Sequence, residues 1–240
     1  MHQIVRVSAA PAPSWDTVKP KTTPERTAVF AEPVRLLYDV RAGGDSAYTA
    51  SGYLQWQTEG PQYSARLDMS AFGFRLRTWT SKGRLGQDGL QPDVFGDKPR
   101  GAEQSTRFQR DRGIITFSEN TLEVPLQTGA QDKLSALLQL GALVAGAPGH
   151  YPANTHVNFQ AADAHRAERW TFKAAAMAPV ELPGGMLSAI QFTKEPTPEF
   201  DQRIEVWLAP AMQYLPVRLR ITEANGAFAD LLWRKSQKPD

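Results

Sequence analysis

Few residues of this chain have the types and spacing that enzyme chemistry requires. The segment Gly44-Asp45-Ser46 is similar to the nucleophile block of serine esterases, in which the serine lies on a strand-to-helix turn and is oriented by a downstream Asp and His. Here the block stands between two expected strands, where Gly-Gly-Asp is typical of a turn. Asp163-Ala-His165 does not supply the Asp and His of a triad at the expected spacing. Gly44-Asp45-Ser46 is therefore predicted to be a hairpin turn.

The four histidines of the chain do not follow a metal-binding pattern. Neither His-x-x-x-His nor His-Glu-x-x-His occurs, and these spacings would place two imidazoles on one face of a helix. His150, His156 and His165 lie close together in the sequence, so a site assembled across strands stays open as an alternative. We expect surface or loop histidines and no bound metal.

Acidic residues are frequent but form no recognisable catalytic pair. The densest group surrounds the proline-interrupted segment KEPTPEFD and consists of Glu195, Glu199, Asp201 and Glu205. The two carboxylates of a glycosidase are defined by their separation in space, so spacing along the chain does not identify them. Phosphate-binding glycine loops of the types G-x-x-x-x-G-K-[ST] and G-x-G-x-x-G do not occur. We therefore predict a protein without catalytic residues or a cofactor, with a hydrolase as an alternative.

Positive charge and aromatic side chains coincide in one part of the chain. Residues 75–112 hold nine basic and five acidic side chains, whereas the whole chain has a net charge of +2 and does not predict a nucleic-acid partner. Strand alternation places Trp79 on the face of neighbouring arginines, where stacking or cation–π contact suits an anionic polymer or an envelope protein. The predicted partner surface consists of Arg75, Arg77, Trp79, Lys82 and Arg84. A sheet covered on both faces would show the same pattern.

The elements that must position these side chains are mostly β-strands. Apolar and polar residues alternate strictly at 62–69 and again around 204–208 and 217–221. This alternation is typical of antiparallel sheets with one buried face. Turn signals such as Asn-Gly at 225–226 separate the strands. About a dozen strands with short connections predict a mainly β fold, a curved antiparallel meander that forms an open or closed barrel.

One segment, TGAQDKLSALLQLGALVAGAPGH at 128–150, has helical spacing instead. Thr128 and Gln131 fit a capping box and Gly146 fits a helix end, so we predict one main helix over about 131–146. Its apolar sector is too wide for a helix on one surface, which predicts packing on the concave side of the sheet. A lid over a lipid-sized cavity and insertion into a membrane surface are the alternatives. The candidate ligand-binding residues are Leu134, Leu137, Leu138 and Leu140.

Composition also bears on domain organisation and compartment. Prolines are frequent at 8–32, so we predict a flexible Ala/Pro-rich tether or tail at 1–32, a single β-rich domain at 33–235 and a C-terminal tail at 236–240. The chain has no cysteine, which fits a cytosolic or an exported protein. No window reaches the roughly 18 apolar residues that a membrane span needs, and the N-terminus has no apolar signal-peptide region.

Three phrases, taken in order, resemble the domain-of-unknown-function 3108 family: SKGRLGQDGLQPDVF at 81–95, GAQDKLSALLQL at 129–140 and EVWLAPAMQYLPVRLRI at 205–221. PVRLLYDV precedes them and NGAFADLLW follows, so the resemblance covers about 33–235. It implies an exported envelope protein of a Gram-negative bacterium with a curved antiparallel β-meander, located in the periplasm or associated with the envelope. It carries over no catalytic residues.

These observations together predict a non-catalytic periplasmic or cell-envelope protein whose curved sheet holds a lipid or another apolar or amphiphilic ligand. The alternative is a structural or interaction module that docks an envelope partner through the basic and aromatic surface. A cavity beneath the helix would favour the first hypothesis, and a filled interior would favour the second.

Overall fold

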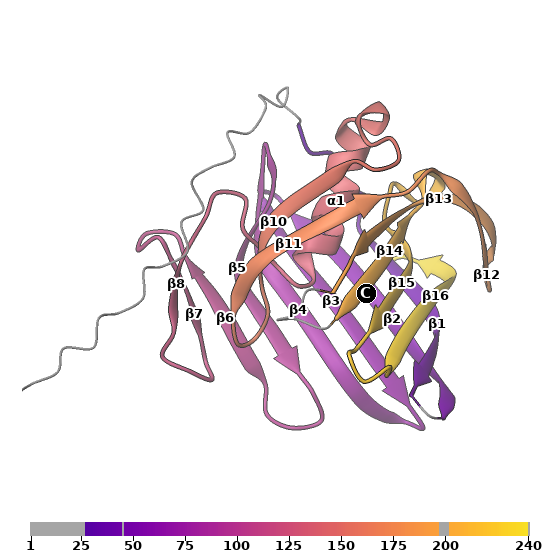
Figure 1. Ribbon diagram of the computed structural model, residues 1–240, viewed down its shortest axis with the longest axis horizontal. Coiled ribbons are helices and arrows are strands. Elements are labelled where there is room, and N and C mark those ends of the chain that lie inside the picture. The colour runs from indigo at the N-terminus through magenta and orange to yellow at the C-terminus, as the bar shows by residue number, and fades with distance from the viewer. Residues whose placement is uncertain (1–26, 45, 197–201, 240) are drawn as a thin grey trace, which may run out of the picture.

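The computed structural model describes residues 27–44, 46–196 and 202–239 of the chain. Within them lie sixteen β-strands, one α-helix and two short 3₁₀ helices (Figure 1). The strands are β1 (Val34–Gly43), β2 (Ala47–Glu59), β3 (Gln62–Ala71), β4 (Phe74–Gly86), β5 (Gly89–Lys98), β6 (Gln104–Gln109), β7 (Ile114–Phe117), β8 (Glu123–Pro125), β9 (Gln131–Asp132), β10 (His156–Ala162), β11 (Ala167–Ala174), β12 (Ala178–Leu182), β13 (Gly185–Lys194), β14 (Arg203–Leu208), β15 (Pro216–Thr222) and β16 (Phe228–Gln237). The helices are α1 (Ser135–Gly146), η1 (Pro148–His150) and η2 (Pro210–Met212).

The strands form one long sheet in the order β8-β7-β6-β5-β4-β3-β2-β1-β16-β15-β14-β13-β11-β10-β9, and β12 pairs with β13 beside this path. Strands that follow one another in the chain are mostly neighbours in the sheet, and β1 pairs with β16 at the centre. All pairings are antiparallel except that of β9 with β10. The predicted antiparallel meander is confirmed.

The two ends of this sheet curl toward each other around α1 (Figure 1). The two ends of the sheet are held together by hydrogen bonds from side chains, and not by a continuous ladder of paired strands. The Gln131 amide of β9 donates a hydrogen bond to the Leu90 carbonyl of β5 at 2.8 Å. The Thr106 hydroxyl of β6 donates to the Asp163 carbonyl, directly after β10, at 2.6 Å. The result is a barrel-like sheet with the helix on its concave side, as predicted.

Packed residues extend a little beyond 33–235 at both ends of the predicted domain. Residues 27–32 pack on the domain, where the Val29 N–H donates to the Ala142 carbonyl of α1 at 3.0 Å. At the other end, β16 continues to Gln237. Hydrogen bonds to elements distant in the sequence hold these segments, and local composition does not reveal such partners. Residues 1–26 of the predicted tether lie outside the described part.

The start of the helix differs from the prediction. The helix begins at Ser135, and Gln131 with Asp132 forms the short strand β9. The capping box with Thr128 is wrong, because the Asp132 carboxylate takes the capping role: its Oδ1 accepts from the backbone N–H groups of Leu134 at 2.9 Å and Ser135 at 2.7 Å. A carboxylate in this place satisfies two of the free N–H groups at a helix start.

Helix α1 ends at Gly146, as predicted, and is buried on nearly all sides. Leu137 and Leu140 are 2% and 0% exposed, and burying such a side chain stabilises a fold by about 1.5–3 kcal/mol. One position shows how closely the sheet side approaches the helix. A Cβ added at Gly141 would lie within 2.3 Å of the Tyr214 carbonyl oxygen. Only a glycine fits there without displacing the backbone of the η2–β15 connection.

A second, smaller core lies on the outer face of β14–β16. The hairpin of β12 and β13 folds over this face, and the buried members of the cluster are Leu182, Ala189, Ala209, Val217 and Leu232. Trp207 packs against the cluster, and the Arg218 guanidinium lies 4.5 Å from its ring centroid. In this part the sheet is therefore covered on both faces, as one of the alternatives predicted.

We expect Gly141→Ala to lower the free energy of unfolding by about 1–3 kcal/mol, because the new methyl group overpacks the contact with Tyr214. Urea denaturation measures this difference. Gly149→Ala is the matched control, since a Cβ at Gly149 meets nothing within 4 Å. Equal stability of the two variants would contradict the close approach of α1 to the sheet.

Candidate functional site

The four leucines predicted to bind a ligand pack the interior. Leu134, Leu137 and Leu138 line a cavity of about 10 Å³ between α1 and the sheet. This is about the space of one water molecule. Leu140 is 0% exposed within the same core. The helix thus fills the concave side, and the volume beneath it is too small for a lipid chain.

The predicted basic and aromatic surface does not form as one surface. Trp79 is 2% exposed and belongs to the interior core. Arg77 lies beside it and makes a bidentate contact with Asp97 at 2.8 and 2.5 Å. Trp79 faces the interior because it pairs with Leu67 of β3, which belongs to the same core. The β3–β4 register also shifts at a β-bulge between Met69 and Ser70, which interrupts the alternation of inward and outward side chains along β4.

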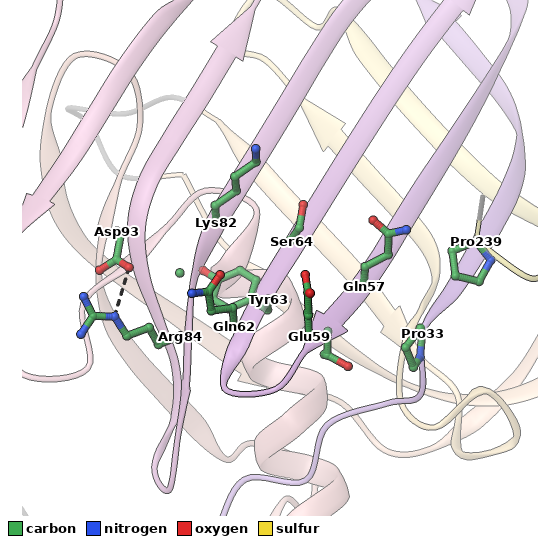
Figure 2. Close-up of a pocket in the computed structure, with 12 residues that line it drawn as sticks. Pro33, Gln57, Glu59, Gln62, Tyr63, Ser64, Lys82, Arg84, Asp93 and Pro239 are labelled. Atoms are coloured by element: carbon green, nitrogen blue, oxygen red, sulfur yellow. Dashed lines mark ion pairs between the residues drawn. The ribbon is translucent and has the colours of Figure 1, made fainter.

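Lys82 and Arg84 lie elsewhere, in an open groove of about 670 Å³ beside the β2–β3 hairpin (Figure 2). Most of its lining residues carry polar side chains, and Arg84 Nε lies 3.4 Å from Asp93 Oδ2. Glu59 also lines the groove, so two basic side chains face two carboxylates. This balance of charge does not favour an anionic polymer at this place.

An apolar pocket lies at the opposite end of the barrel, and we call it the mouth pocket. Its volume is about 200 Å³, below the roughly 300–1,000 Å³ of pockets that enclose a drug-sized ligand. Strands β1–β4, β15 and β16 contribute most of its wall. Its lining residues are Val40, Ala42, Tyr48, Met69, Leu76, Arg77, Trp79, Gln202, Ile221, Glu223, Ala227, Phe228 and Ala229. Such a pocket suits one end of an apolar chain.

A buried lysine lies against the tryptophan of the mouth pocket. Lys133 precedes α1 and places its Nζ 4.8 Å from the Trp79 ring centroid. Burial lowers the pKa of Lys133 to about 8, and repulsion by Arg77 acts in the same direction, whereas Asp163 and other carboxylates oppose it. Within the described residues the Trp79 Nε1 donor is buried without an acceptor. Sequence analysis missed Lys133, whose only signal was a lysine inside an apolar segment.

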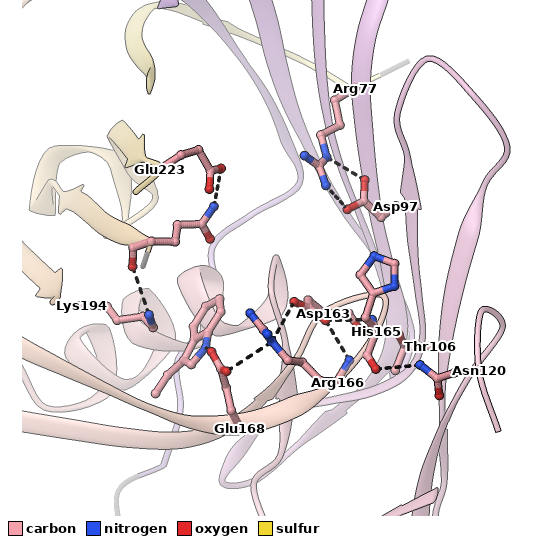
Figure 3. A network of polar contacts seen from close by, with 12 residues as sticks. Arg77, Asp97, Thr106, Asn120, Asp163, His165, Arg166, Glu168, Lys194 and Glu223 are labelled. Atoms are coloured by element: carbon pink, nitrogen blue, oxygen red, sulfur yellow. Dashed lines mark hydrogen bonds and ion pairs between the residues drawn. The ribbon is translucent and has the colours of Figure 1, made fainter. Parts of the chain in front are cut away.

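Further charged side chains surround this end of the interior (Figure 3). Arg166 Nε lies 3.6 Å from Glu168 Oε2 and 3.9 Å from Asp163 Oδ2. Lys194 Nζ donates to the Gln202 carbonyl at 3.1 Å. Burial lowers the pKa of Lys194 and raises that of Glu168. The charged groups at this end thus come mostly from β11, β13 and the β10–β11 turn, and β4 and β5 add the Arg77–Asp97 pair.

A second buried polar group joins the sheet to the start of α1. The Ser81 hydroxyl donates to Asp132 Oδ2 at 2.5 Å, and Tyr63 Oη lies 2.9 Å from Ser81 Oγ. Burial raises the pKa of Asp132 to about 6, although four hydrogen bonds from Ser135, Ser81 and Leu134 act against this rise. A nucleophilic serine needs a base to take its proton. Ser81 and Asp132 are both 0% exposed, so a substrate has no access to this pair, which joins β4 to the start of the helix.

The other candidate groups of the sequence are not brought together. Ser46 lies in the β1–β2 connection, and Asp45 of the same segment is outside the described residues. Within the part of the chain that the structure describes, no group of three or more His, Asp or Glu side chains is placed to hold a metal ion. Glu199 and Asp201 also lie outside this part. None of the described helices is long and apolar enough to cross a membrane.

We expect the stability of the protein to fall as pH rises through the pKa of Asp132. The folded-state pKa of about 6 exceeds the ordinary 3.8, so protonation stabilises the fold at low pH and ionisation removes this contribution. Asp132→Asn keeps an acceptor for the helix N–H groups but does not titrate. Between pH 4.5 and 7.5 the wild type should lose about 2 kcal/mol relative to this variant. Urea denaturation at both pH values measures the loss, and parallel pH profiles would contradict it.

Several solved structures match this chain. The barrel-like protein of domain of unknown function DUF1849 from Brucella abortus has a TM-score of 0.56 and 13% identity, over 89% of this chain and all of its own. This similarity supports the fold alone. A candidate lipoprotein from Parabacteroides distasonis is more distant, with a TM-score of 0.32 and 8% identity over 88% of this chain and 99% of its own. The search of curated proteins found no match.

The comparison with protein families covers most of the folded part. The family described as "Protein of unknown function (DUF3108)" matches residues 37–232. These residues extend from β1 into β16 and include α1 together with every strand that lines the mouth pocket. The chain belongs to the DUF3108 family.

Proposed function

We propose that this protein is a non-catalytic envelope protein that holds the apolar end of an amphiphilic molecule in the mouth pocket. The observation that carries the proposal is the division of the barrel interior. The part around α1 is filled to a remaining volume of about 10 Å³, whereas the part at the mouth keeps about 200 Å³ of apolar space.

The walls of the pocket support an apolar occupant. Val40, Ala42, Ile221 and Ala229 come from the three adjacent strands β1, β15 and β16, and Met69 comes from β3. An empty apolar space lacks the dispersion contacts that an occupant would supply. The volume is small, so a chain end enters while the rest of the molecule stays outside.

Charged groups beside the pocket support an occupant with a polar part. Arg77 and Glu223 line it, and the buried Lys133, whose pKa burial lowers to about 8, lies near and contacts Trp79. An anionic head group of the ligand would favour the charged form of Lys133, because an opposite charge nearby raises the pKa of an ammonium. The unpaired Trp79 N–H is a further donor for an acceptor atom.

The proposal that the protein is not an enzyme is supported by the chemistry of its buried polar groups. Ser81 and Asp132 are both buried away from solvent, and three of the carboxylates of Figure 3, those of Asp97, Asp163 and Glu168, are paired with arginines. The alternative function, docking of an envelope partner through the basic and aromatic surface, is less well supported because Trp79 is buried and does not reach that surface. Placement in the periplasm or at the envelope rests on the sequence resemblance to exported proteins.

We expect Ala42→Phe to weaken binding of a fluorescent fatty acid at least tenfold, because the new ring occupies the pocket. Fluorescence titration and displacement measure the affinity, and native mass spectrometry of gently purified protein detects a co-purifying lipid. Thr49→Phe is the matched control, since the Thr49 side chain is exposed on β2 and does not line the pocket. Absence of both a bound lipid and fatty-acid binding in the wild type would refute the proposal, as would equal weakening by both variants.

A further inference from the structure

The turn between β3 and β4 exposes two aromatic side chains. Phe72 is 82% exposed and Phe74 is 73% exposed, which are the largest values among the big hydrophobic side chains in the described residues. A side chain of this size usually contributes to a core. Two of them at one hairpin tip form an apolar protrusion that the fold of this chain does not use.

The backbone of this turn is unfavourable for a phenylalanine. Phe72 has φ 52° and Gly73 has φ 78°, and both lie between the paired residues Ala71 and Phe74. Two-residue turns with two positive φ angles prefer Asn-Gly or Asp-Gly, because a bulky side chain is strained in the left-handed region. A strained residue that also gains nothing from burial points to a role outside folding.

The turn stands at the rim of the mouth pocket. Leu76, two residues after Phe74 on β4, lines the pocket, and so does Met69 at the end of β3. Tyr48, at the start of β2, lines it too and is 41% exposed. The β3–β4 and β15–β16 turns project at the same lower edge of the barrel, away from α1 (Figure 1). The apolar protrusion thus lies beside the opening through which a chain would enter.

A basic hollow accompanies the turn on the outer face of the sheet. Its volume is about 140 Å³, and Arg66, Arg75 and Lys98 line it together with Glu103 and the hydroxyl residues Thr78 and Thr80. Asp68 contacts both arginines, at 2.7 and 3.6 Å. Three cations against two carboxylates leave an excess of positive charge. The Thr78 hydroxyl already donates to Asp68 at 2.8 Å, so the Thr80 hydroxyl and these cations are the groups that suit a phosphate oxygen.

We propose that this end of the barrel docks on a lipid bilayer, with Phe72 and Phe74 inserted at the head-group boundary and the basic hollow on an anionic lipid phosphate. This inference rests on the proposed function, which takes an amphiphilic molecule as the occupant of the mouth pocket. It deepens that function, because docking would bring the mouth pocket to the lipid. The charge of the hollow complements an anionic membrane surface. Aromatic side chains favour the boundary between head groups and acyl chains.

The first experiment measures flotation of the purified chain with vesicles of phosphatidylcholine, and with vesicles of equal parts phosphatidylcholine and phosphatidylglycerol. We expect Phe72→Asn combined with Phe74→Thr to lower the vesicle partition coefficient about 100-fold, because two aromatic side chains no longer insert. Asn suits the turn conformation, so the unfolding midpoint should stay equal or rise. Met186→Thr is the matched control: Met186 is 62% exposed on the β12–β13 hairpin and should leave binding unchanged.

The second experiment tests the hollow by charge reversal. Arg75→Glu combined with Lys98→Glu should remove the preference for phosphatidylglycerol vesicles and leave binding to pure phosphatidylcholine within a factor of about two, because only the electrostatic attraction is lost. Lys82→Glu combined with Arg84→Glu is the control with the same change of charge, since Lys82 and Arg84 lie in the groove at the other end of the strands. Equal effects of these two charge changes would overturn the role of the hollow.

The outcomes separate this inference from the proposed function. The Phe72→Asn and Phe74→Thr variant should still bind the fluorescent fatty acid in the absence of vesicles, and Ala42→Phe should still bind vesicles. No flotation of the wild type, undiminished flotation of the double phenylalanine variant, or an equal loss with Met186→Thr would overturn bilayer docking. Vesicle binding without fatty-acid binding would refute the proposal that the mouth pocket holds an amphiphile, and it would still support the docking surface.

Discussion

The helix α1 is apolar nearly all around, and the rest of the fold depends on the need to cover it. A helix of this kind cannot lie on a flat sheet, because one face would stay in water. The sheet therefore continues past both sides of the helix, and its ends meet through the side chains of Gln131 and Thr106. The tight contact at Gly141 and the packing of residues 27–32 complete the cover.

The helix also divides the interior into two parts. It begins at Ser135 and extends away from the mouth, so leucines fill one part and leave the other to smaller side chains such as Ala42 and Ala229. The two charged residues before the helix lie near the border. Asp132 caps the helix and links it to β4 through Ser81, and Lys133 lies against Trp79. The filled part supports the fold, and the open part is the pocket in which we propose that a ligand binds.

Features that stability alone does not explain gather at the mouth. They are the open apolar volume, the unpaired Trp79 N–H, the strained Phe72 and the basic hollow around Arg75. Each feature alone is weak support for a binding site, but all of them lie at the same end of the barrel. A carrier that exchanges an amphiphile with a membrane would need its opening, its apolar contact and its charge complement on the same side.

The sequence by itself determined the mainly β meander, the single buried helix and its end at Gly146, because alternation, helical spacing and turn residues act locally. The tertiary structure alone decided the start of the helix, the burial of Trp79 and the site. Asp132 caps the helix from a strand, and Trp79 faces inward because the barrel closes around it. The mouth pocket is formed by residues from β1–β4 and β15–β16, and no local pattern predicts which interior side chains leave a space between them.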